Sequence, residues 1–494
     1  MISKKLKDTN FILCFSVITI LIFRLILTFA IPLLDKTEAR YAEIARLMYE
    51  TKDWIVVQID YGFPFWAKPP LSTWLSAGSF EIFGANEFSA RFPSYLLSVL
   101  LLFIAGKLAK KEGKSFYLPG FILLTMPEFL IHTGVVSTDS ALFVCITIMM
   151  LSFWKVVNNT EKTIWNYLFF IALGLGFLAK GPLIMVLTFP PLFVWCLLDL
   201  NRLKAVFSRL PIILGILIVV AIALPWYYLI EQKSPGFTNY FFVGEHYKRF
   251  LVPGWNGDLY GNPKYVPMGI VWVYMIAFAF PWFPIVVYKL WKNRTTILKN
   301  PWVSFLVLWL LWLPFFFTFS KNILHTYILP TTFPMMLLMV HYWNEFDSKK
   351  TLIRIGLFFP TAIFVIASVA ILLPKDLFTK LSGYPDVSYI MNSDKYLLEK
   401  LKVNTENKQI PLYYFVKVEN DSVVNKQKNY SGEFYSNGKE QVLINQKEVD
   451  SVLSLNKKLF FVIPTRKLEQ VSKESLEKMN LIDHNNNTSV FESK

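Results

Sequence analysis

Apolar runs recur along this chain and constrain its fold more than any other feature. A helix of about 20 apolar residues crosses the roughly 30 Å hydrocarbon core of a bilayer. Hydrophobic residues make up 54% of the chain, whereas soluble domains contain about 45–50% apolar residues. The sequence therefore predicts a mainly α, polytopic membrane protein. About eleven spans can be placed, near residues 11–31, 90–106, 116–134, 139–157, 164–179, 182–198, 210–230, 267–288, 302–319, 324–343 and 355–373.

The basic residues of the apolar half predict a topology. The formal net charge is +15, which in a soluble protein would suggest nucleic acid. Here the basic residues gather in short loops, which the positive-inside rule places in the cytoplasm. Alternating the spans from a cytoplasmic N-terminus puts every such loop inside. Membrane topology therefore accounts for the positive charge, and we expect no nucleic-acid partner. The basic groups are Lys4, Lys5 and Lys7; Lys107, Lys110, Lys111 and Lys114; Arg202, Lys204 and Arg209; Lys289, Lys292, Arg294 and Lys299; and Lys349, Lys350 and Arg354.

The last part of the chain differs in composition and predicts a second domain. Residues 374–494 are rich in Lys, Glu, Asn and Ser. Residues 410–418 and 459–463 have strand patterns, and residues 465–479 have the pattern of an amphipathic helix. We expect a transmembrane domain over 1–373 and a small α/β domain over 374–494 outside the cytoplasm.

The first outer loop, residues 32–89, predicts two helices at the membrane surface. Over residues 38–50, Tyr41, Ile44, Ala45 and Met48 share an apolar face. Arg40, Glu43, Arg46 and Glu50 lie largely opposite. That pattern favours a helix lying in the membrane interface. A second helix is expected to begin at Pro69-Pro70, because proline is tolerated in the first turn.

Charged residues of this loop are the first candidates for chemistry. Asp35 and Glu38 have the spacing of a helix cap, but a carboxylate at the membrane surface can also act as a base or bind a metal or a sugar hydroxyl. Arg40 and Lys68 can reach lipid headgroups, or they can hold a phosphate.

Three later outer segments carry further candidates. Asp139 begins a span and either caps it or reaches the same outer cavity as the first loop. Glu245 and Arg249 have the i, i+4 spacing of a helical ion pair, and Glu245 with His246 would supply two ligands of a metal site. Lys321, His325 and Tyr327 stand at the outer entrance of another span, where a lone His usually forms structural hydrogen bonds.

These motifs resemble one known family. The chain is similar to the protein O-mannosyltransferase and lipid A aminoarabinose transferase group of membrane glycosyltransferases, and the resemblance covers nearly its whole length. The matching motifs are Thr37-Glu38-Ala39-Arg40-Tyr41-Ala42-Glu43-Ile44, Asp53-Trp54, Lys68-Pro69-Pro70-Leu71, Phe83-Gly84, Arg91-Phe92-Pro93-Ser94, Ala179-Lys180-Gly181-Pro182, Pro225-Trp226, Glu245-His246 to Arg249-Phe250, Ser320-Lys321 to Tyr327-Ile328-Leu329-Pro330, Pro411-Leu412-Tyr413-Tyr414 and Phe434-Tyr435-Ser436.

The resemblance implies a GT-C fold of about 11–13 transmembrane helices in a bacterial inner membrane, with the site and the C-terminal domain on the periplasmic face. It implies inverting transfer of a sugar from a polyprenyl-phosphate donor to lipid A or a related glycolipid. Lys68 and Arg249 would hold the phosphate, with Tyr327 and Lys321 nearby. Arg40 and a first-loop acid would stand at the reacting centre, with Asp139 as a further catalytic candidate.

Two positions depart from the family pattern. Thr37 replaces the acid that usually precedes the Glu, so Asp35 or Glu38 would take its place, and Ala67 replaces an acid before the Lys-Pro. No cofactor is established, and a divalent metal stays open. Protein O-glycosylation is the alternative function. A flippase or an inactive scaffold would belong to other classes.

Overall fold

A computed structural model describes most of the chain. The described residues are 2–33, 37–159, 163–249, 266–372, 429–438, 440–455, 457–484 and 488–494, with short pieces at 252, 255, 257–260 and 412–415. Asp35, a candidate catalytic residue, lies outside them.

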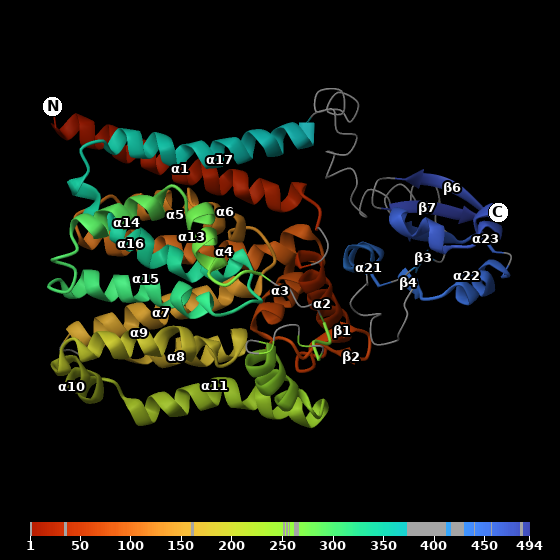
Figure 1. Ribbon diagram of the computed structural model, residues 1–494, viewed down its shortest axis with the longest axis horizontal. Helices are drawn as coiled ribbons and strands as arrows, with labels where there is room; N and C mark the ends of the chain where they lie inside the picture. Colours follow the sequence, from red (N-terminus) through yellow and green to blue (C-terminus); the bar gives the residue numbers. More distant parts are fainter. Residues whose placement is uncertain are drawn as a thin grey trace.

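Helices form one body, and each predicted span coincides with helical structure (Figure 1). The N-terminus and α10 lie at one end of this body, whereas α2 and α3 lie at the opposite end. The helices of the body are α1 (Ile2–Ala30), α4 (Glu87–Lys111), α5 (Leu118–Leu124), α6 (Pro127–His132), α7 (Thr138–Asn158), α8 (Trp165–Lys180), α9 (Leu183–Leu197), α10 (Leu200–Arg209), α11 (Ile212–Lys233), η1 (Asn239–Lys248), α13 (Ile270–Phe278), α14 (Trp282–Lys292), α15 (Pro301–Thr318), η2 (His325–Thr331), α16 (Thr332–Tyr342), η3 (Trp343–Glu345) and α17 (Lys349–Leu372).

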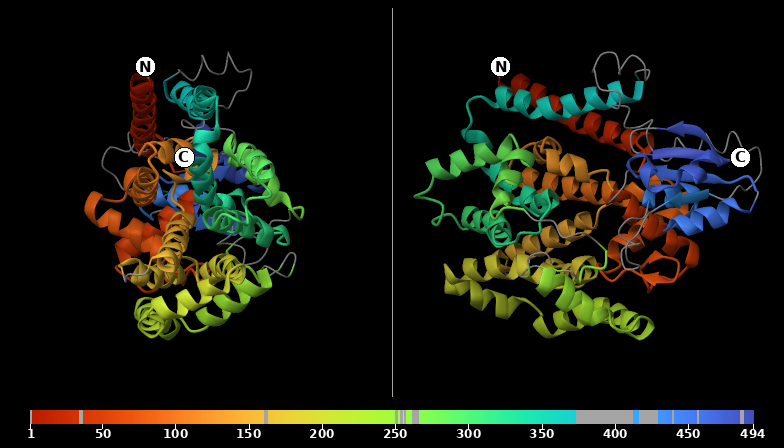
Figure 2. Two further views of the ribbon diagram at one scale, coloured as in Figure 1. Left: turned by 90° about the vertical axis from the view of Figure 1, so that its left-hand side faces the viewer. Right: turned by 45° about the vertical axis from the view of Figure 1, so that its right-hand side comes forward.

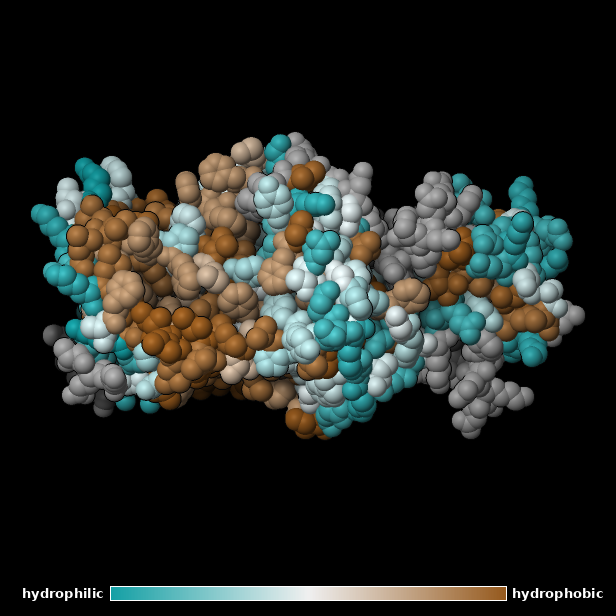
Figure 3. Space-filling view, turned by 90° about the horizontal axis from the view of Figure 1, so that it is seen from below, coloured by the Kyte–Doolittle hydropathy of each residue, from teal (hydrophilic) through white to brown (hydrophobic). Residues whose placement is uncertain are grey.

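The body has the surface of a multi-pass membrane protein. Within the described residues, five helices are long and apolar enough to cross a bilayer, and the bent pair α13–α14 would make six. Figure 3 shows a continuous apolar band over the helical part, bordered by hydrophilic residues at both ends. Such a band is far larger than a soluble monomer exposes.

Proline breaks several spans that the sequence predicted as single helices. The predicted span 267–288 is divided into α13 and α14. The two helices are bent by 106° at the break between them, which contains Pro281. The predicted span 116–134 is α5 and α6, which begins at Pro127. Because proline has no N–H and clashes with the preceding turn, a helix ends before it or bends at it.

The first outer loop folds into two helices and a short hairpin. These elements are α2 (Glu38–Thr51), β1 (Gln58–Asp60), β2 (Phe63–Pro64) and α3 (Leu71–Phe83), so both helices predicted in this loop are confirmed. Glu43 and Arg46 are only 1% and 3% exposed, and their side chains pair at 2.7 Å. The prediction of an exposed polar face is therefore wrong for Glu43 and Arg46, whereas Glu50 on the same helix is 50% exposed. Ion pairing lets both charged groups be buried, and α2 is packed on both sides.

The C-terminal part forms a mixed five-stranded sheet with strand order β4-β3-β5-β7-β6. β3 pairs in parallel with β4 and β5, whereas β7 pairs antiparallel with β5 and β6. Its elements are β3 (Leu412–Phe415), α21 (Tyr430–Ser436), β4 (Glu440–Leu443), α22 (Gln446–Leu453), β5 (Phe460–Pro464), η5 (Thr465–Gln470), α23 (Lys473–Glu477), β6 (Met479–His484) and β7 (Thr488–Ser493).

Both strands predicted in this part are present, but the single helix predicted over 465–479 is wrong. The segment is a 3-10 turn and the short helix α23, because Ser472 is the N-cap of a new helix and its side chain accepts from Ser475 N.

The sheet stands at the end of the helical body that carries α2 and α3 (Figure 2). Its helix α21 packs against α2. The Tyr435 hydroxyl accepts from Leu33 N at 2.6 Å and donates to Glu87 at 3.1 Å. One side chain of the C-terminal part thus joins the end of α1 to the start of α4.

Candidate functional site

A polar cavity of about 280 Å³ opens where the first loop meets the ends of several helices. Its wall brings together residues from the five predicted outer positions: the start of α2, the segment before α3, the start of α7, the segment after η1, and η2. The charged or titratable lining residues are Glu38, Arg40, Tyr41, Lys68, His132, Asp139, Lys180, Arg249, Asp258, Tyr260, His325 and Tyr327. The sequence therefore predicted correctly that these distant segments converge.

A second cavity of about 270 Å³ adjoins the first. Lys68, Lys180, Arg249 and Tyr327 line both cavities, so they form the boundary between them. Apolar residues contribute much of the second wall, namely Pro182, Leu183, Val186, Phe241, Phe316 and Phe317. Val186 is 36% exposed at the outer surface of the body. The pair of cavities suits a ligand with a polar head and an apolar tail.

Two cations at this boundary share one buried carboxylate. Glu245 is 3% exposed, and its Oε2 accepts from Lys68 Nζ at 3.2 Å and from Arg249 Nη1 at 2.7 Å. Burial raises the pKa of the Glu245 carboxyl, but the charges of Lys68 and Arg249 outweigh it, so this pKa lies below its usual value. The predicted Glu245–Arg249 pair is present, and Lys68 joins it. The ionised carboxylate holds both cations at the cavity edge.

Arg40 extends the positive wall of the polar cavity. Its Nη1 donates to the backbone carbonyl of Tyr260 at 2.8 Å, which fixes the direction of the guanidinium. Its Nε is buried and has no hydrogen-bond partner among the described residues. A buried donor without a partner is costly, so an anionic or hydroxyl oxygen of a ligand would be stabilised there.

Asp139 reaches the cavity, as one of the two sequence interpretations proposed. Ser137 is the N-cap of α7, and its hydroxyl accepts from Asp139 N at 3.1 Å. The Asp139 carboxylate is instead paired with Lys180 Nζ at 2.5 Å. Lys180 also lies over the Tyr327 ring, 5.2 Å from its centroid. Lys180 thus fixes Asp139 between α7 and the end of α8.

Glu38 lines the cavity, but its carboxylate is bound by neighbouring parts of the fold. Its carboxylate accepts from Arg91 Nε and Nη2, both at 2.8 Å, and from Val136 N at 3.1 Å. Arg91 in turn donates to backbone carbonyls at the end of α1. With its oxygens committed to three donors, Glu38 joins α1, α4 and the start of α7. Thr37 is the N-cap of α2 and makes no side-chain cap bond, whereas the predicted cap of Asp35 with Glu38 involves a residue outside the described part of the chain.

His246 does not form a metal pair with Glu245. Its Nδ1 lies 2.9 Å from the Phe241 carbonyl and its Nε2 lies 3.2 Å from the Lys180 carbonyl, so both ring nitrogens face backbone oxygens. Burial lowers the pKa of this imidazole. Across the part of the chain that the structure describes, no three His, Cys, Asp or Glu side chains group to hold a metal ion. Among the described residues, Glu245 and His246 therefore do not form the predicted metal pair.

Lys321 lies in the link between α15 and η2, as the sequence predicted, but its side chain is not part of either cavity wall. It lines neither cavity, although its neighbours Ser320 and Asn322 line the second one. Its backbone carbonyl accepts from Val266 N at 2.9 Å. We therefore leave Lys321 out of the phosphate-binding set.

Sequence reasoning did not name Lys180, Asp258 or Tyr260 as site residues, although Lys180 lies in one of the motifs of the family resemblance. Lys180 was visible as an ionisable residue at the end of an apolar run, which is a functional signal in membrane proteins. Asp258 lies 3.6 Å from Arg249 Nη2. The Tyr260 hydroxyl donates to the Pro64 backbone carbonyl at 2.8 Å. No sequence pattern indicated that Tyr260 belongs to the site.

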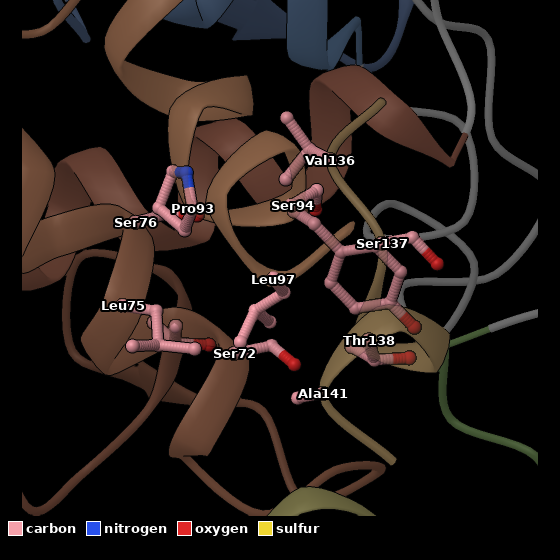
Figure 4. A pocket seen from close by; sticks show the side chains of 12 residues that line it. Ser72, Leu75, Ser76, Pro93, Ser94, Leu97, Val136, Ser137, Thr138 and Ala141 are labelled. Atoms are coloured by element: carbon pink, nitrogen blue, oxygen red, sulfur yellow. The ribbon is translucent and has the colours of Figure 1, made fainter. Parts of the chain in front are cut away.

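A much smaller pocket lies beside the polar cavity, between α3, α4 and the start of α7 (Figure 4). Val136, Ser137 and Thr138 line both. Its volume of about 10 Å³ has room for a single water molecule. The buried Ser72 hydroxyl lines this pocket and has no partner among the described residues. The pocket is too small for a sugar, so we assign it no ligand.

Comparisons with known proteins agree with this architecture. Residues 9–241 match the family model of dolichyl-phosphate-mannose-protein mannosyltransferases. A relative from Photorhabdus laumondii, named undecaprenyl phosphate-alpha-4-amino-4-deoxy-L-arabinose arabinosyl transferase, is 30% identical over 359 residues, 67% of this chain and 60% of the relative. A protein of the same name from Serratia proteamaculans is 29% identical over 323 residues, 62% of this chain and 55% of the relative. The chain thus spans a little over half the length of these relatives.

Two crystal structures of ArnT from Cupriavidus metallidurans share the fold. The apo structure superposes with a TM-score of 0.71 at 18% identity and covers 98% of each chain. The structure bound to undecaprenyl phosphate gives a TM-score of 0.70, covering 96% of this chain and 97% of that one. The predicted GT-C fold and the family resemblance are confirmed.

Proposed function

We propose that this ArnT-like GT-C protein transfers a sugar from a polyprenyl-phosphate donor to lipid A or a related envelope glycolipid. The observation that carries this proposal is the junction of the two cavities, where Lys68 and Arg249 stand between the polar cavity and a second cavity that has an apolar side formed by Leu183, Val186 and Phe316. A polyprenyl-phosphate sugar has the same three parts in the same order: sugar, phosphate and apolar tail. The curated relatives carry names of undecaprenyl-phosphate-dependent transferases, which agrees with that order.

The donor phosphate would lie against Lys68 and Arg249. Arg offers a planar pair of donors and Lys a point charge, and both suit phosphate oxygens. Glu245 keeps the two cations ordered without a ligand. The tail would then run along Leu183, Val186 and Phe316 toward the bilayer.

The reaction is a direct displacement at the anomeric carbon. The bond from that carbon to the phosphate oxygen breaks, and its electron pair leaves with polyprenyl phosphate. Lys68, Arg249 and Arg40 stabilise the charge that grows on the phosphate, which is often the largest catalytic effect. Asp139, paired with Lys180, lines the polar cavity and would position the hydroxyls of the sugar.

The site is expected at the periplasmic face of a bacterial inner membrane, with the N-terminus in the cytoplasm. The C-terminal α/β part, which packs on α2 through α21, would cover the same face. The division into a domain over 1–373 and another over 374–494 belongs to this proposal.

Mass spectrometry of envelope lipids tests the proposal. A strain lacking the protein should lose one sugar from a glycolipid and accumulate a polyprenyl-linked sugar. Wild-type protein should restore the glycolipid, and the Lys68→Met variant should not. If only the glycosylation of exported proteins changes, the acceptor is a protein and not a glycolipid. If the lipids are unchanged and no polyprenyl-linked sugar accumulates, the transferase activity is refuted.

A further inference from the structure

A buried carboxylate with two histidines forms part of the cavity wall and is not used by the reaction above. Glu128 in α6 is completely buried. Its Oε2 lies 2.9 Å from His325 Nδ1. Its Oε1 lies 3.1 Å from His132 Nδ1, and that nitrogen makes its hydrogen bond with the Glu128 backbone carbonyl at 2.9 Å. Both histidines line the polar cavity, whereas Glu128 stands behind them. Three side chains from α6 and η2 thus form one connected cluster.

The chemistry of the cluster fixes the histidine tautomers. An ionised carboxylate only accepts hydrogen bonds, so each Nδ1 that faces Glu128 carries its proton. In a neutral imidazole the other nitrogen, Nε2, is then an acceptor. His132 is 3% exposed, so it is a buried structural member of the cluster. The His325 side chain is 36% exposed at the cavity, so His325 is the member that a substrate can reach.

The His325 ring is held in one plane. It stacks on Phe278 with centroids 4.5 Å apart and an interplanar angle of 9°, and Tyr274 meets it edge-on at 6.4 Å. A side chain that is stacked on one side and hydrogen-bonded at Nδ1 is preorganised, as a catalytic base must be. The sequence expectation that His325 forms structural hydrogen bonds accounts for Nδ1 alone.

The acids that line the polar cavity are engaged elsewhere. Glu38 is bound by Arg91 and by Val136 N, and Asp139 is paired with Lys180. Asp258 lies near Arg249. An acceptor oxygen that arrives with its proton needs a base at the moment of attack. Of the described groups around the cavity, His325 Nε2 has the geometry of that base.

We propose that His325 is a catalytic base and that Glu128 is its positioning residue. The inference rests on the proposed glycosyl transfer and specifies its acceptor as an oxygen nucleophile that carries a proton, from a hydroxyl or a hydrogen phosphate. As that oxygen bonds to the anomeric carbon, its proton moves to His325 Nε2. The bond to the donor phosphate breaks with its electron pair on polyprenyl phosphate. The imidazolium, paired with ionised Glu128, later releases the proton to water.

The groups around His325 are defined by the elements that pack on η2. Helix α6 presents Glu128 and His132, α13 presents Tyr274, α7 presents Asp139, which lines the same cavity, and η2 itself presents Tyr327. Lys180 of α8 faces the same cavity from beside Asp139. The sequence of α15 contains no titratable residue. Glu128 is the carboxylate in direct contact with the ring, so it sets the stability of the protonated form.

The test uses purified full-length protein in vesicles made from the lipid extract of the deletion strain, in which donor and unmodified acceptor both remain. Sugar addition is followed by mass spectrometry from pH 5 to 9. His325→Gln should lower the initial rate about 100-fold or more and remove the acidic limb of the rate profile. Binding of undecaprenyl phosphate should stay within twofold, and imidazole should partly restore activity to His325→Ala.

Two further variants separate the roles. Glu128→Gln should keep an acidic limb and lower the initial rate less than His325→Gln does, because the ring loses the partner of Nδ1 but keeps Nε2. His341→Gln, in α16 and outside both cavities, is the matched control and should behave as wild type. Fragmentation of the product shows whether the sugar sits on a hydroxyl or on a phosphate, which distinguishes the two acceptor sources.

The outcomes are distinct. If wild-type protein adds sugar and His325→Gln remains within threefold at every pH, the base role is refuted while the transferase activity stands. If wild-type protein adds sugar to no lipid of the extract, both the proposed function and the base role of His325 are refuted.

Discussion

Lys68→Met should weaken the binding of undecaprenyl phosphate by about 30-fold. The Lys68 side chain is 21% exposed and stands 3.2 Å from Glu245, which is 3% exposed. Two unit charges 4 Å apart interact by about 4 kcal/mol at an effective dielectric constant of about 20. Glu245 already neutralises part of the ammonium charge and Arg249 supplies a second cation. We therefore expect a loss of about 2 kcal/mol, which is about 30-fold in Kd.

The assay is titration of purified protein in detergent with undecaprenyl phosphate, followed by native mass spectrometry. Lys233→Met is the matched control, because Lys233 pairs with Asp53 at 3.3 Å, is 50% exposed and lines neither cavity. The control should change the affinity by less than twofold. Because Lys68 is only partly exposed, its effect should persist in 0.5 M salt, where contacts between exposed charges are screened. An affinity of Lys68→Met within twofold of wild type would refute the assignment of the phosphate to this junction.

Three other outcomes follow from buried contacts. Glu43→Gln should lower the free energy of unfolding by about 3 kcal/mol, because it breaks the buried pair with Arg46; thermal denaturation measures this, and the exposed Glu81→Gln should cost less than about 1 kcal/mol. Tyr435→Phe should cost about 1–3 kcal/mol and speed hydrogen exchange in α21, since it leaves Leu33 N and Glu87 without the hydroxyl; unchanged exchange would contradict this docking role. The Glu245 carboxyl has a lowered pKa in the folded protein, so its ion pairs stabilise the fold fully above the ordinary pKa of 4.5. This stabilisation is lost as the pH falls through the lowered pKa. The difference in melting temperature between wild type and Glu245→Gln should therefore be constant from pH 6 to 8 and shrink below about pH 4.5.

The helical body was predictable because each membrane-spanning helix requires a long apolar run, which is easily recognised in a sequence. A long apolar run must form a helix in a bilayer, since every backbone polar group needs an internal partner. The places where the prediction failed have local causes. Pro127 and Pro281 divide runs whose hydropathy is continuous, and hydropathy alone does not register a lost backbone donor.

The candidate site was predictable in part. Lys68, Arg249, Arg40 and Asp139 were found because charges beside apolar runs are conspicuous, and the alternating topology placed them together. Their partners depend on tertiary contacts. Glu38 meets Arg91 across 53 positions of sequence, and Glu128 meets His325 across 197.

The same limit explains the error in α2. A helical pattern shows which residues share a face, but it does not show that a second element covers the charged face. Glu43 and Arg46 are buried because they neutralise each other, a possibility that periodicity cannot reveal.

The most direct measurement is a cryo-electron microscopy structure of the protein with undecaprenyl phosphate. The account predicts phosphate density in contact with Lys68 and Arg249, and the first isoprene units along Leu183, Val186 and Phe316. Phosphate density away from these cations, or a tail that avoids the second cavity, would contradict it.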